Sequence, residues 1–177
     1  MVSMSANRKI ILISLLMFSL FTIAQENCNF KIDKHKILSN LNLDKFLMEL
    51  QNDNFEIYYD KKHIPDSLIK SLACLNGEFS IANPKEKYQT NCEANEKLPK
   101  RKLILLLKSK NNIVVTYFCG GFATSVHILF LRFNNGKITD LWSGISVKKL
   151  SSKEDILKYI KDNRNKKNGL NSSAIRI

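Results

Sequence analysis

The residue pair Asn135-Gly136 constrains the fold more than any other feature of this chain. A two-residue type I′ turn needs positive φ at both central residues, and Asn-Gly meets that requirement with little strain. The apolar runs on either side are therefore predicted to form a β-hairpin, in which Phe133 faces Ile138 and Leu129 faces Trp142. Both faces of this hairpin are mostly apolar, so both need cover from other parts of the chain.

Two further turns extend the hairpin to a four-stranded antiparallel meander over about residues 102–145. Gly120-Gly121 is predicted as a second tight turn, which places Cys119 opposite Phe122. The run Lys110-Asn111-Asn112 is a third and weaker turn signal. A slip of one residue would move a whole strand to the other face, so the agreement of the three turns is the main support for this meander.

Helical patterns flank the meander and predict an α+β fold. Apolar residues recur at helical spacing in 37–53, with a bend near Asn40, and again in a helix that starts at Pro65. Gly77 lies where a left-handed residue would end that second helix. Ser151-Ser152-Lys153-Glu154 matches a capping box that opens a third helix after the sheet. We therefore expect the meander to be covered by two N-terminal helices and one C-terminal helix.

The N-terminus is predicted to be a secretory signal peptide, residues 1–24. Arg8 and Lys9 precede an apolar run of 15 residues, which is shorter than the roughly 20 residues of a membrane-spanning helix. Thr22-Ile23-Ala24 fits the small-x-small rule for cleavage, so we expect cleavage near Ala24. The alternative is a signal that is retained as an anchor. After cleavage the protein would be periplasmic or secreted, with no stable membrane span.

The remaining chain is long enough for one domain, predicted as 25–165, followed by a basic tail, 166–177, that is expected to fray. Loss of the signal lowers the formal net charge from +12 to +10. This balance would attract an acidic protein or an anionic envelope ligand as a partner. The alternative, which the sequence favours, is that the basic residues serve general solubility. Nucleic acid is not expected, because the chain is exported and its aromatic residues are not interleaved with the basic runs.

All four cysteines, Cys28, Cys74, Cys92 and Cys119, follow the signal segment. An even count in an exported chain predicts two disulfides, and four cysteines allow three pairings. We favour Cys74 with Cys92 and Cys28 with Cys119, because Cys74 projects away from the apolar stripe of its helix, toward the long segment that contains Cys92. No close-spaced set of Cys and His residues predicts a metal site.

Catalytic candidates are few. Ser125 and His127 lie two residues apart on a predicted strand and share a face with Thr116 in the register above. That spacing is about 6–7 Å, too long for a direct hydrogen bond without distortion. Asp140 is the acidic candidate, expected at the rim of the sheet because a buried charge is costly. Cys119 and His127 are predicted on opposite faces, which disfavours a thiol nucleophile.

These observations favour an exported, non-enzymatic binding domain, inhibitor-like or immunity-like, that recognises a protein or an anionic ligand. The alternative is a small exported hydrolase with a polar site near Ser125, His127 and Asp140. No nucleotide-binding loop is present, since Gly120-Gly121 lacks the further residues that such loops need, and no cofactor is predicted. An open cleft that holds the three polar residues together would favour the hydrolase, and burial of the same residues under helices would favour the binding domain.

Overall fold

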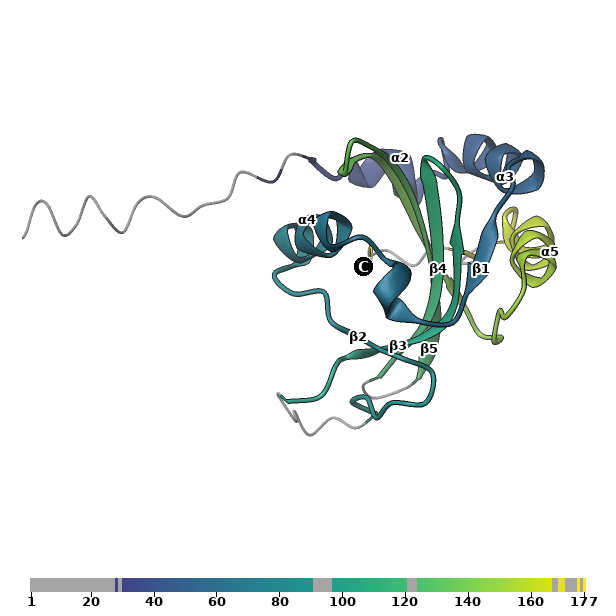
Figure 1. Ribbon diagram of the computed structural model, residues 1–177. Coiled ribbons are helices and arrows are strands. Elements are labelled where there is room, and N and C mark those ends of the chain that lie inside the picture. The colour runs from purple at the N-terminus through teal and green to yellow at the C-terminus, as the bar shows by residue number, and fades with distance from the viewer. Residues whose placement is uncertain are drawn as a thin grey trace, which may run out of the picture.

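The computed structural model describes residues 28, 30–90, 97–120, 124–166, 169, 170, 175 and 177. The predicted signal peptide lies outside the described residues, and so does Cys92. The described chain is an α+β fold in which helices pack on both faces of one sheet (Figure 1). Its elements follow in the order α2 (Lys34–Leu38), α3 (Leu43–Asn52), β1 (Glu56–Tyr58), the 3₁₀ helix η1 (Lys61–His63), α4 (Asp66–Asn76), β2 (Ile81–Ala82), β3 (Arg101–Lys108), β4 (Asn112–Cys119), β5 (Ser125–Asn134), β6 (Lys137–Ser146) and α5 (Lys153–Asn163).

The sheet has the strand order β1-β3-β4-β5-β6, and its last four strands are the predicted antiparallel meander. It is wider than the predicted sheet, because two short strands join β3. β1 pairs antiparallel with Leu106–Lys108, and β2 pairs parallel with the first two residues of β3. The prediction of an antiparallel α+β fold is confirmed, but the described chain has more strands than the predicted four and more α-helices before the meander than the predicted two.

The β5–β6 turn forms as predicted, but the register beyond it differs by one residue. Asn135 and Gly136 have φ of 48° and 74°, which confirms the type I′ requirement. Phe133 faces Ile138, and the ladder then shifts between Arg132 and Phe133. The extra residue on β6 is a β-bulge, so Trp142 faces Phe130 and not Leu129.

The predicted two-residue turn at Gly120-Gly121 is wrong. Cys119 pairs with Ser125, so five residues connect β4 to β5, and the register moves by three residues. An odd shift exchanges the two faces of a strand, which explains why the predicted face assignments fail. Gly120 is needed for another reason: a Cβ at this position would lie 1.7 Å from the main-chain oxygen of Gln89.

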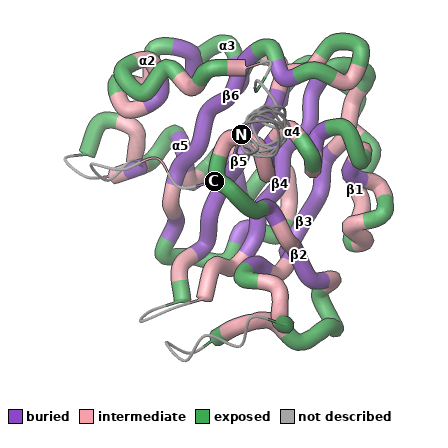
Figure 2. The backbone as a smooth tube through the Cα atoms, turned by 90° about the vertical axis from the view of Figure 1, so that its left-hand side faces the viewer, coloured by how far each residue is buried: buried purple, intermediate pink, exposed green. Residues whose placement is uncertain are grey.

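Different helices cover the two faces of the sheet, which we call the α3 face and the α4 face. On the α3 face, Phe46 of α3 packs against Phe130 with ring centroids 5.4 Å apart. Trp142 is fully buried beside them. α5 lies on the same side of the sheet as α3 (Figure 1), and the central strands between the two layers are largely buried (Figure 2). On the α4 face, Leu68 and Leu72 are the buried residues of α4. Covering both faces satisfies the apolar character of the strands, as the sequence predicts.

Local signals explain where the helices begin and end. Asn40, with φ of 55°, separates α2 from α3 at the predicted bend, so three α-helices of the described chain, and not two, precede the meander. Gly77, with φ of 77°, ends α4 as predicted. The Ser152 Oγ accepts a hydrogen bond from the Asp155 amide, so the cap of α5 lies one residue later than the predicted capping box.

The C-terminal segment, expected to fray, holds two buried residues. Leu170 is 3% exposed and its main-chain oxygen accepts a hydrogen bond from the Ile145 amide on β6. Ile177 is 6% exposed on the α4 face. These two residues are therefore part of the packed domain.

Candidate functional site

Ser125 and His127 form a closer pair than the sequence predicts. The Ser125 Oγ and the His127 Nε2 are 2.9 Å apart, a hydrogen-bond distance, because side chains at alternate positions of a strand can lean toward each other. His127 is 1% exposed and its ring stacks on Tyr117, with centroids 5.3 Å apart. The expected separation of about 6–7 Å is therefore wrong, since it took both side chains as perpendicular to the strand.

The other candidates on these strands are not placed as predicted. Thr116 lies on the α3 face, fully buried, and its hydroxyl donates a hydrogen bond to the main-chain oxygen of Leu150. It is therefore separated from Ser125 by the sheet. Cys119 pairs directly with Ser125 and so shares the α4 face with His127. The prediction that Cys119 and His127 lie on opposite faces is wrong, for the same three-residue shift of register.

Asp140 is neither at an exposed rim nor near the Ser125–His127 pair. It faces Arg132 across β5 and β6 and is 8% exposed, on the α3 face. Its carboxylate accepts from the Lys36 Nζ at 2.9 Å, the Asn42 Nδ2 at 2.8 Å and the Arg132 Nη1 at 3.2 Å. These contacts attach α2 and the start of α3 to the edge strand β6.

The charge on Asp140 is stabilised by these donors. Burial alone would raise the pKa of this carboxyl, but the hydrogen bonds from Lys36 and Asn42 and the charge of Lys36 outweigh it and hold the pKa below its ordinary value. Arg132 also donates to both carboxylate oxygens of Glu49, at 2.7 and 2.6 Å. An ionised carboxylate with hydrogen bonds to both oxygens fits a structural role. A general acid would instead need a raised pKa, so that it carries a proton to donate.

The disulfide arrangement corrects the favoured pairing. Cys28 is bonded to Cys74, with Cα atoms 5.8 Å apart. Because a cysteine forms one disulfide, the pairings of Cys74 with Cys92 and of Cys28 with Cys119 are both wrong. Cys119 carries no disulfide in this structure, and Cys92 lies outside the described residues.

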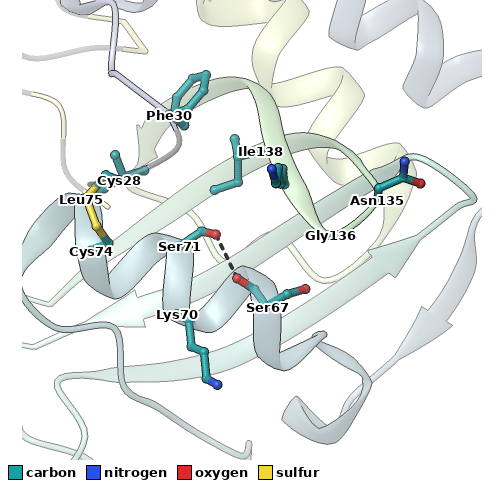
Figure 3. A pocket seen from close by; sticks show the side chains of 11 residues that line it. Cys28, Phe30, Ser67, Lys70, Ser71, Cys74, Leu75, Asn135, Gly136 and Ile138 are labelled. Atoms are coloured by element: carbon teal, nitrogen blue, oxygen red, sulfur yellow. Dashed lines mark hydrogen bonds between the residues drawn. A yellow bond between two sulfur atoms is a disulfide. The ribbon is translucent and has the colours of Figure 1, made fainter. Parts of the chain in front are cut away.

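A surface hollow of about 490 Å³ lies beside this disulfide, between α4 and the β5–β6 turn (Figure 3). The Asn135-Gly136 turn forms one wall, and Phe30, Ile138 and Leu75 supply apolar lining. In Figure 3 the Lys70 side chain extends away from the turn. The side chain of Ser71 is engaged with α4 itself, since its hydroxyl donates to the Ser67 main-chain oxygen at 2.8 Å.

A second hollow of about 400 Å³ lies between α5 and the segment that leads into it, and we call it the lysine groove. Four lysines and two aspartates contribute to its lining: Lys148, Lys149, Lys158, Lys166, Asp155 and Asp162. The basic run after Lys148 is visible in the sequence, but its gathering around one hollow is not. This gathering depends on how α5 folds back along the sheet, which no local pattern specifies.

The described residues contain no group of three or more His, Cys, Asp or Glu side chains arranged to hold a metal ion. Within the same ranges, no helix is long and apolar enough to cross a bilayer. The Cys28–Cys74 disulfide is compatible with an extracellular or periplasmic location. No family model, no curated protein and no solved structure matches the chain.

Proposed function

We propose that this protein is an exported, non-enzymatic binding domain, and that the lysine groove binds a ligand with several negative charges. The observation that carries the proposal is the convergence of four lysines on one hollow of about 400 Å³. A concave surface lined by one sign of charge concentrates the opposite charge and raises the rate of encounter with it. The formal net charge, +10 after loss of the predicted signal peptide, acts in the same direction.

The lysines of the groove are available to a ligand. Lys148, Lys149 and Lys158 are exposed, and none of them forms an ion pair with another described residue. The Lys166 ammonium donates to the neutral Asn163 side chain, at 3.1 Å, and forms no ion pair within the described part of the chain. Ammonium groups that have no carboxylate partner remain free to contact a bound anion.

One of the two aspartates in the groove, Asp155, already accepts hydrogen bonds from a neighbouring residue of the protein. The Asp155 carboxylate accepts hydrogen bonds from the amide and the hydroxyl of Ser151, and the amide bond is the main cause of its lowered pKa. Asp155 lies in the first turn of α5, where a negative charge is favoured. Counted formally, four lysines and two aspartates give the lining of the groove a charge of +2.

The hydrolase alternative rests on the Ser125–His127 hydrogen bond alone. A serine nucleophile needs a base that a third group orients, and Asp140 lies on the opposite face of the sheet. His127 is 1% exposed, so a substrate would have to reach a ring that is covered by the fold. The geometry therefore supports the binding domain better.

The experiment measures the affinity of inorganic tripolyphosphate, a compact multivalent anion, by calorimetry. The double variant Lys149→Gln/Lys158→Gln is expected to weaken binding about tenfold, since each exposed ion pair contributes only modest free energy. Lys85→Gln/Lys87→Gln is the matched control, because it removes the same charge from two exposed lysines outside the groove.

The proposal fails if both double variants weaken the binding of tripolyphosphate equally. The net charge of the protein, and not the groove, would then determine the affinity. A polyglutamate peptide serves as the second probe and represents an acidic protein partner. Tighter binding of this peptide, with the same dependence on Lys149 and Lys158, would assign the groove to an acidic protein surface.

A further inference from the structure

The strand β1 forms one edge of the sheet, since it pairs with β3 and with no other strand of the described chain. The Ser109 amide donates to the Asn112 oxygen where β3 turns into β4. Hydrogen-bonded pairs alternate along an antiparallel ladder, so the registers of β1 and β4 on β3 direct the main chains of Glu56 and Tyr58 toward β3. The N–H and C=O groups of Ile57 therefore point away from the sheet.

A row of apolar side chains accompanies this open edge. Through its partners on β3, β4 and β5, Ile57 shares the α3 face with Phe130, and Phe55 and Tyr59 occupy the alternate positions on either side of it. Ile57 is 55% exposed and Tyr59 is 57% exposed. Natural sheets usually protect an edge with lysine, proline or a bulge, and β1 contains neither lysine nor proline and pairs without a shift of register. The edge is thus open to a further strand.

The segment around β1 is complementary to a second copy of itself in the antiparallel direction. With a two-fold axis at Ile57, every facing pair is favourable: Phe55 with Tyr59, Glu56 with Tyr58, and Asp53 with Lys61. The first pair is aromatic, and the second joins a carboxylate to a phenol that can donate to it. The third pair contributes least, since Lys61 already forms an exposed ion pair with Glu86 at 2.8 Å.

Charge disfavours the two neighbouring registers. An axis at Glu56 would place that carboxylate opposite its own copy, and an axis at Tyr58 would place Glu56 opposite Asp60 of the second copy. Like charges that face each other destabilise a pair of strands. The axis at Ile57 also brings the two outward-pointing main chains together, so that Ile57 exchanges two hydrogen bonds with its copy.

We propose that β1 is a dimerisation edge, at which a second copy of this chain adds its own β1 antiparallel and joins the two sheets into one. The same patch of both copies forms the contact, as in most symmetric dimers. Main-chain hydrogen bonds supply affinity, as in other cases of strand addition, and the apolar row of each copy covers that of the other. None of the facing residues lines the lysine groove, so this proposal does not depend on the proposed function.

Sedimentation equilibrium of the exported protein measures the dissociation constant of the dimer. Ile57→Lys places two ammonium groups at the axis and is expected to weaken dimerisation at least about tenfold. Met48→Lys is the matched control, because Met48 on α3 is also 55% exposed and the substitution adds the same charge. We expect this control to leave the dissociation constant unchanged. Both substitutions are at exposed positions, and equal thermal midpoints confirm that both variants fold.

Cross-linking by a mild oxidant tests the position of the axis. In a hydrogen-bonded antiparallel pair the Cα atoms are about 5.5 Å apart, within the range of about 4.4–6.8 Å found in disulfides. Ile57→Cys is therefore expected to form a covalent dimer. Tyr59→Cys should not, because the two copies of residue 59 would lie four positions apart on the ladder, or about 13 Å.

Three results would overturn the proposal. The first is a protein that stays monomeric at every concentration, which would leave the edge to an extended segment of another protein. The second is dimerisation of a folded Ile57→Lys variant with the affinity of the wild type. The third is cross-linking of Tyr59→Cys as fast as Ile57→Cys, or of the wild type under the same oxidant, since the axis would then lie elsewhere.

Discussion

The Asp140→Asn variant provides the sharpest test of the structure, because it removes one charge from the centre of a network. Asp140 accepts from Lys36, Asn42 and Arg132, and its own side chain also accepts from the Leu141 amide at 3.0 Å. An asparagine of nearly the same shape keeps the volume but presents two N–H donors where only acceptors fit. The loss therefore reports on charge and hydrogen bonding and not on packing.

The expected loss is smaller than for a fully buried pair. Breaking a buried ion pair costs about 3–5 kcal/mol when the remaining charge is stranded. Here the Lys36 side chain is 39% exposed, and Arg132 keeps its contacts with Glu49. We therefore expect a loss of about 2–3 kcal/mol in the free energy of unfolding, or roughly 5–10 °C in the thermal midpoint.

The pH dependence distinguishes charge from shape. A carboxyl whose pKa is lowered by folding stabilises the protein fully above its unfolded pKa, near the ordinary value of 3.8, and loses this contribution as the pH falls through the lower folded pKa. Urea unfolding at about pH 7 should show the full difference between the wild type and Asp140→Asn, and at about pH 2.5 the difference should shrink.

Glu154→Gln is the control for the Asp140 experiment, because it removes one negative charge from an exposed position on α5. We expect it to change the free energy of unfolding by less than about 0.5 kcal/mol at either pH. The reasoning is refuted if Asp140→Asn behaves like this control at neutral pH. A large loss that is equal at both pH values would also refute it, since shape and not charge would then be responsible.

Three more predictions concern other parts of the fold. Replacing both Cys28 and Cys74 by serine opens a loop with a sequence separation of 46 residues and is expected to cost about 4 kcal/mol in denaturant unfolding; a loss below about 1 kcal/mol would contradict the pairing. Ser125→Ala is expected to leave binding of tripolyphosphate unchanged, and labelling of Ser125 by a fluorophosphonate would instead support a hydrolase. Gly120→Ala is expected to destabilise the protein by more than about 2 kcal/mol, because the added Cβ would lie 1.7 Å from the Gln89 oxygen; an unchanged midpoint would exclude this close approach.

Local signals in the sequence predicted local geometry well. Asn135-Gly136 specifies a turn because few residues tolerate positive φ, and Gly77 ends α4 for the same reason. The apolar runs then identify the four long strands: β4, β5 and β6 contain several β-branched and aromatic residues, whereas β3 is mainly leucine. These are properties of neighbouring residues, so they can be read without knowledge of the fold.

The errors arose where the geometry depends on distant residues. The bulge at Thr139 changes the partner of Trp142, although nothing at Thr139 itself signals an extra residue. Cys28 and Cys74 are separated by 46 residues in the sequence. They meet because the N-terminal segment that holds Cys28 lies beside α4, which holds Cys74. The Asp140 network likewise forms only where α2 and the start of α3 meet β6. The residue pattern of β6 alone does not show these partners, so it suggests an unpaired charge at the rim of the sheet.

Two buried charged residues of the described chain differ in how far the fold satisfies them. Asp140 has a donor for each carboxylate oxygen, so its role is complete within the fold. Arg101 is 5% exposed, and its Nε and Nη1 atoms are buried without a hydrogen-bond partner among the described residues. Its Nη2 donates to the main-chain oxygen of Ile177, and its guanidinium lies 4.7 Å from the centroid of the Phe79 ring. These two contacts offset part of the cost of burying this cation, because a guanidinium is attracted to the face of an aromatic ring.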